Sequence, residues 1–138
     1  MAKDTQLSNA AANAEANALA RLLDNGYRRV YDGSKPATAD TAITSQVLLA
    51  ELRFAATSAP AAVDGVLTFT LITDSEANAN GTAAWYRDLQ SNGTTVVMDG
   101  TVGTSDANLN LSTTSVFAGQ QVAITSATHT VAKATAGL

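Results

Sequence analysis

The chain has 138 residues with 8 basic and 12 acidic side chains, 28 alanines, 19 threonines and no cysteine. The absence of cysteine excludes disulfides, thiolate metal sites and cysteine nucleophiles. The net charge of −4 argues against a nucleic-acid partner, because phosphate binding needs clustered Lys and Arg and the only basic pair is Arg28-Arg29. No run of 18 apolar residues is present, so we expect neither a membrane span nor a membrane partner.

A chain of this length is expected to form one domain, but with a thin core. Leu, Ile, Val and Phe together number 29, about 21% of the chain, which is close to the level below which disorder is common. Much of the remaining apolar content is alanine, which buries little area and therefore stabilises the fold only modestly. We expect the core to be supplemented by an interface with another chain.

Residues Thr5 to Asn25 are predicted to form one helix, which ends at the left-handed stop Asn25-Gly26. Its apolar side chains form one stripe at helical spacing, and its polar side chains form a second stripe on the far side. Three asparagines weaken the helix, so it needs a surface to lie on. The apolar stripe is Leu7, Ala11, Ala14, Ala18 and Leu22, widened by Leu19 and Leu23, and the polar stripe is Asn9, Asn13, Asn17 and Arg21.

Two interpretations of this N-terminal segment remain open. Residues 1–26 either pack on the chain's own β domain, residues 27–138, or form a helical arm that docks on a partner. The arm is the interpretation we adopt, because a face of small residues permits close approach to another chain. Its candidate interface residues are Leu7, Leu19, Leu22 and Leu23. An extended conformation of the first ten residues is a further alternative.

After Gly26 the apolar period changes to two, which is typical of strands. Short runs rich in valine, threonine and aromatic residues recur at roughly ten-residue spacing. The pattern predicts a mainly β fold, an antiparallel jelly-roll-like barrel or sandwich with an N-terminal helix or arm. The predicted strands are residues 27–31, 47–54, 66–72, 83–90, 95–99, 108–111, 115–117 and 121–131.

The clearest hairpin signal is the pair Asn92-Gly93 between two predicted strands. A two-residue type I′ turn requires positive φ at both central positions, which Asn and Gly adopt most readily. This turn would pair Leu89 with Val96, Arg87 with Met98 and Trp85 with Gly100. We therefore expect the Trp85 ring to lie over the glycine, which leaves room for it.

The aspartates and the histidine of this chain belong to residue types that often act in catalysis or metal binding, but their sequence context favours structural roles. Asp32, Asp64 and Asp99 each precede a glycine, a pattern typical of turns, and no D-x-D-x-D-G loop with a distal glutamate is present for calcium. His129 is the only histidine and stands among threonines, without a second histidine or a nucleophile motif, so we expect a structural or surface role. No catalytic, cofactor-binding or metal-binding residue is predicted.

Trp85 and Tyr86 are adjacent in a predicted strand, so they point to opposite faces of the sheet. We expect one of them in the core and the other on the surface. A sugar-binding platform built on Tyr86 is an alternative function that this arrangement allows.

Five stretches between residues 22 and 103 share a recognisable pattern: LLDNGYRRVYDG (22–33), PATADTA (36–42), VLLAELRF (47–54), GTAAWYR (81–87) and GTTVVMDGTVG (93–103). In these stretches the chain resembles a family of small structural proteins encoded by tailed bacteriophages. Some members are similar to capsid cement, or decoration, proteins, which are small β-barrel proteins that clamp neighbouring capsomers on the assembled shell. The resemblance carries no catalytic motif, so it implies no chemical role for any residue.

The resemblance implies a non-enzymatic virion protein on the exterior of the capsid. It would bind the phage major capsid protein and stabilise the shell, and we expect it to act as a homodimer because two-fold contacts are the commonest way to bridge symmetric neighbours. Residues Met1 to Asp4 show no signal-peptide pattern, so we expect synthesis in the cytoplasm of the host bacterium. The alternatives are a phage tail or head-tail adaptor protein and a carbohydrate-binding β module on the virion surface.

Overall fold

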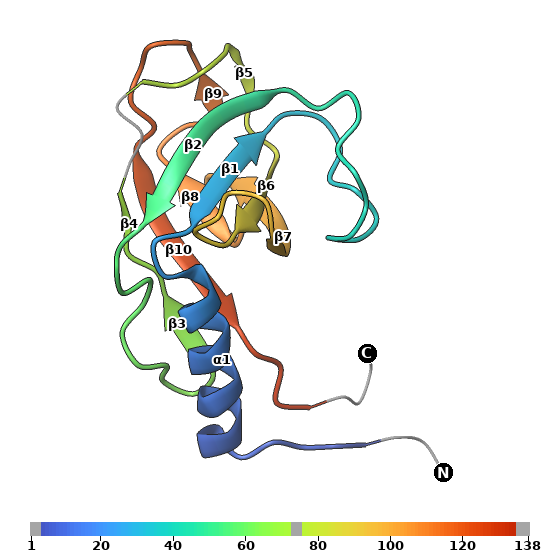
Figure 1. Ribbon diagram of the computed structural model, residues 1–138, viewed down its shortest axis with the longest axis vertical. Coiled ribbons are helices and arrows are strands. Elements are labelled where there is room, and N and C mark those ends of the chain that lie inside the picture. The colour runs from blue at the N-terminus through green and yellow to red at the C-terminus, as the bar shows by residue number, and fades with distance from the viewer. Residues whose placement is uncertain (1–3, 73–75, 135–138) are drawn as a thin grey trace.

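The computed structural model describes residues 4–72 and 76–134, which form one helix and a strongly curled sheet (Figure 1). Within these residues the helix lies at one end of the sheet, and residues 4–8 and 131–134 also lie at that end. The elements are α1 (Asn9–Leu23), β1 (Tyr27–Tyr31), β2 (Leu48–Phe54), β3 (Val66–Thr68), β4 (Leu71–Ile72), β5 (Gly81–Thr82), β6 (Trp85–Leu89), β7 (Val96–Gly103), β8 (Leu109–Leu111), β9 (Ser115–Val116) and β10 (Ile124–Thr130).

The large sheet has the strand order β3-β10-β8-β7-β6-β1-β2-β4, and β5 pairs with β9 in a separate small sheet. Its two outermost strands, β3 and β4, are separated in the chain by only Phe69 and Thr70. Phe69 N donates to Ala127 O of β10 at 2.9 Å, and Ala55 N, next to β2, donates to Thr70 O at 3.1 Å. One short segment, residues 66–72, therefore forms both edge strands, so the sheet curls back on itself.

The mainly β fold with an N-terminal helix confirms the predicted fold class. The prediction of a wholly antiparallel arrangement is wrong in one place, because β7 and β8 pair in parallel, with Val102 opposite Leu109. The jelly-roll arrangement is not confirmed, since the main strands form one mixed sheet instead of two antiparallel ones.

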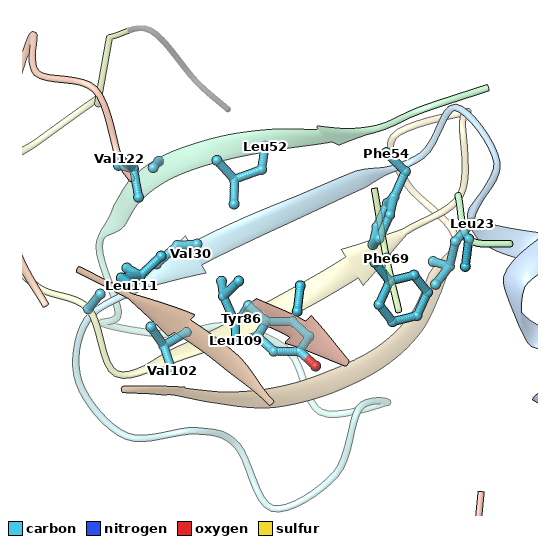
Figure 2. Close-up of a cluster of buried hydrophobic side chains, with 14 of the residues drawn as sticks. Leu23, Val30, Leu52, Phe54, Phe69, Tyr86, Val102, Leu109, Leu111 and Val122 are labelled. Atoms are coloured by element: carbon cyan, nitrogen blue, oxygen red, sulfur yellow. The ribbon is translucent and has the colours of Figure 1, made fainter. Parts of the chain in front are cut away.

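The core fills the concave side of the curled sheet (Figure 2). Strands contribute alternate residues to it, because successive side chains of a strand point to opposite faces. In β1, for example, Arg28 and Val30 are fully buried while Tyr27 and Arg29 remain half-buried. The largest fully buried apolar side chains of this cluster are Tyr86, Phe54, Leu23, Leu49, Leu52, Leu67, Leu109, Leu111 and Val30.

The β6–β7 hairpin corrects the predicted register. Leu89 pairs with Val96 as predicted, but a bulge next to Leu89 shifts the remaining pairs by one residue, so that Arg87 faces Asp99 and Tyr86 faces Gly100. Tyr86 therefore takes the place over the glycine that was predicted for Trp85, and a Cβ on Gly100 would collide with the Tyr86 phenol.

The turn of this hairpin is also not type I′. Gly93 has φ +73°, but Asn92 is not among the described residues with positive φ. The loop is longer than predicted: Gly93 N donates to Gln90 O at 2.9 Å, and Gln90 N donates to Thr95 O at 2.9 Å. Asn92 stabilises the loop through its side chain, since its Oδ1 accepts from Thr94 N and Thr95 N, each at 2.9 Å.

The helix begins later than predicted, at Asn9, because Ser8 caps it by accepting a hydrogen bond from Ala11 N at 3.1 Å. Residues 4–8 are not helical, and Leu7 N donates to Lys133 O at 2.6 Å, in line with the extended alternative. The predicted stop is confirmed by Asn25, which has φ +58°.

The predicted apolar face of the helix is right only in part, because Leu19 and Leu23 pack on the core whereas most of the other residues of that face do not. The buried residues are Ala12, Ala16, Ala20 and Leu23, whereas Ala14, Ala18 and Leu22 are exposed. The reason lies in the asparagines, which were predicted to face solvent: Asn13 Oδ1 accepts from Gly65 N at 2.7 Å and Asn17 Oδ1 accepts from Ala62 N at 2.8 Å. These amides satisfy backbone donors of the loop between β2 and β3, so the helix turns its asparagine side inward.

Candidate functional site

Two charged residues among those described are fully buried, Arg28 of β1 and Asp88 of β6, and they face each other across the two strands. Arg28 Nε lies 2.7 Å from Asp88 Oδ1 and Arg28 Nη2 lies 2.8 Å from Asp88 Oδ2, and both side chains are 0% exposed. This is the two-pronged geometry in which a guanidinium matches a carboxylate. The pair sits inside the curled sheet and is closed off from solvent.

Aromatic rings surround the Arg28 guanidinium. Its central carbon lies 3.7 Å from the ring centre of Tyr86 and 5.2 Å from the ring centres of Phe54 and Phe69. Such contacts offset part of the cost of burying the cation. Arg28 Nη1 has no hydrogen-bond partner among the described residues, so the surrounding groups satisfy only some of the donors of the guanidinium.

Burial shifts the ionisation of this cluster. It raises the pKa of the Asp88 carboxyl above its ordinary value, although the charge of Arg28 and its hydrogen bonds oppose that shift. Burial also raises the pKa of the Tyr86 phenol to about 12, so this hydroxyl stays protonated at neutral pH. Desolvation therefore decides the direction for Asp88 and Tyr86, whereas for Arg28 the effect of burial is outweighed by the charge and hydrogen bonds of Asp88 together, which raise its pKa.

A second ion pair lies on the convex face of the sheet. Arg87 Nε lies 2.7 Å from Asp99 Oδ1, and the two side chains are 6% and 5% exposed. Trp85 stacks on Tyr31 beside it, with ring centres 4.7 Å apart, and donates from Nε1 to Asp32 O at 3.0 Å. Arg87 Nη2 also reaches Thr38 O at 3.5 Å, which ties this face to the loop between β1 and β2.

Trp85 and Tyr86 do point to opposite faces, but both are buried. Each is 1% exposed, so the expectation of one surface residue is wrong. The loop between β1 and β2 contributes contacts on the convex side, which sequence periodicity cannot reveal. A sugar platform built on Tyr86 is excluded by this burial.

The other predicted structural residues lie apart from one another. His129 of β10 is half-buried opposite Leu67. Its pKa is lowered mainly by burial and, to a smaller extent, by the charge of Arg28. Asp32 Oδ1 accepts from Val47 N at 2.6 Å, and Asp64 has φ +52°, as suits turns. Asp99 lies within β7, so its predicted turn is wrong. In residues 4–72 and 76–134, no three His, Asp or Glu side chains gather to hold a metal.

A polar and aromatic surface lies over β1 and β2. It consists of the half-buried residues Tyr27, Arg29 and Glu51 and the exposed Arg53, and we call it the Tyr27 surface. Arg53 pairs with Tyr27 in register, and its guanidinium carbon lies 4.3 Å from the Tyr27 ring centre. Arg29 Nε lies 2.9 Å from Glu51 Oε2. Arg53 is exposed and donates to Asn25 O at 3.1 Å, and no carboxylate of the described residues forms an ion pair with it.

The candidate interface leucines are divided by the fold. Leu23 is 0% exposed and Leu19 packs against the same core, so both serve the chain's own interior. Leu7 is half-buried, and Leu22 is 48% exposed. Only Leu22 of the four offers a large apolar surface to another molecule.

Sequence periodicity missed the ion pairs but contained a signal for them. Two charged residues stand next to each other inside a predicted strand in both Arg28-Arg29 and Arg87-Asp88. Because successive side chains of a strand point to opposite faces, one residue of each dipeptide had to face the core. A buried charge needs a partner, which makes the neighbouring strands the place to look. Which residues form the ion pairs depends on the register between the neighbouring strands.

Among the described residues, no helix is long and apolar enough to cross a membrane. Comparison with protein-family models, with curated proteins and with solved structures finds no match to this chain.

Proposed function

We propose that the protein is a non-enzymatic virion component that binds the outside of an assembled phage capsid. It bridges major capsid subunits as a homodimer and so stabilises the shell. The family resemblance of the sequence motivates this role, and the Tyr27 surface is the structural observation that supports it.

The Tyr27 surface has the chemistry of a protein contact. Tyrosine and arginine are the residues that most often dominate binding energy at interfaces. Arg53 is held in place by the Tyr27 ring and by Asn25 O, and it lacks a carboxylate partner among the described residues. An ordered guanidinium with free donors fits a carboxylate of a partner protein. The capsid contact is therefore an acidic side chain or segment.

The buried charges support a structural rather than a catalytic role. Arg28, Asp88, Arg87 and Asp99 are each bonded to another side chain of the same chain. Their hydrogen bonds hold neighbouring strands together, which is useful in a protein that must withstand forces on a shell. Weak contacts repeated over a lattice then add up to firm attachment.

The test is co-sedimentation with capsids of the encoding phage that lack this protein. Wild type should bind at a fixed ratio to the major capsid protein and should raise the temperature at which shells break. Arg53→Glu should weaken binding at least tenfold. Lys35→Glu, the same charge change at an exposed residue of the loop between β1 and β2, should bind like wild type.

Each failure has a separate meaning. If wild type does not bind shells, the capsid role is wrong and the tail or adaptor role becomes the next one to test on purified tails. If wild type binds and Arg53→Glu binds equally well, the capsid role stands and the Tyr27 surface is not the contact.

A further inference from the structure

We draw no further inference here: the strongest candidate, the uncharged groove between β4 and the first half of β10 that Thr68, Phe69, Leu71, Ile124 and Ser126 help to line, carries nothing because nothing in the structure shows what covers it.

Discussion

Arg28 of β1 and Asp88 of β6 face each other and are joined by hydrogen bonds of 2.7 and 2.8 Å, and both side chains are completely shielded from solvent. The pair links the strands at the centre of the sheet and places a cation against the Tyr86 ring. A buried ion pair contributes little net stability, but it penalises any packing that separates its two members. We therefore regard it as a determinant of strand register.

Removing one member of this pair should be far more harmful than removing both. Asp88→Leu leaves the Arg28 guanidinium buried without an acceptor and should lower the free energy of unfolding by about 3–5 kcal/mol. The double variant Arg28→Met with Asp88→Leu should regain most of that loss, since two apolar side chains replace two desolvated charges. Urea denaturation measures both. A double variant as unstable as the single one would contradict this account.

His129 should make stability depend on pH. Burial and Arg28 lower its pKa in the folded protein below the ordinary value of 6.5. Between that value and the lower folded pKa, the unfolded chain binds a proton that the folded chain does not, so stability falls as pH falls through this window. His129→Gln should remove this part of the slope in urea denaturation between pH 7 and 5. An unchanged slope would mean that His129 titrates normally.

Gly100 should tolerate no side chain, because a Cβ there would overlap the Tyr86 phenol that lies across it. Gly100→Ala should cost about 1–3 kcal/mol through overpacking. Gly103→Ala in the same strand is the control, since the nearest atom to its added Cβ is at 3.3 Å and belongs to the Ala107 side chain. Thermal unfolding of the two variants compares them, and equal losses would argue against the contact.

The loop between β1 and β2 should control the exposure of Trp85, the only tryptophan of the chain. Gln46 ties the ends of this loop, since its Nε2 donates to Ser34 O at 2.7 Å and its Oε1 accepts from Thr44 N at 3.0 Å. Gln46→Ala should loosen the loop, shift Trp85 fluorescence to longer wavelength and increase quenching by acrylamide. Gln120→Ala, an exposed glutamine beyond β9, should leave both unchanged.

Local sequence was sufficient where neighbouring residues decide the structure. The change of apolar period after Gly26 predicted the helix followed by strands, and Asn25 adopts the left-handed conformation predicted for the helix end. Alternation predicted that Trp85 and Tyr86 point to opposite faces. These features depend on contacts within a few residues, so propensity and periodicity carry them.

The register of the β6–β7 hairpin and the side of α1 that is buried were decided by the tertiary structure. A bulge beside Leu89 moved Tyr86 onto Gly100, and the inward face of α1 was chosen by backbone donors at Ala62 and Gly65 that Asn17 and Asn13 satisfy. Because both sides of α1 carry alanine and alanine burial contributes little free energy, the hydrophobic effect only weakly favours burying one side over the other. The hydrogen bonds of buried groups then decided between the faces, and their partners lie 45 and 52 residues away in the chain.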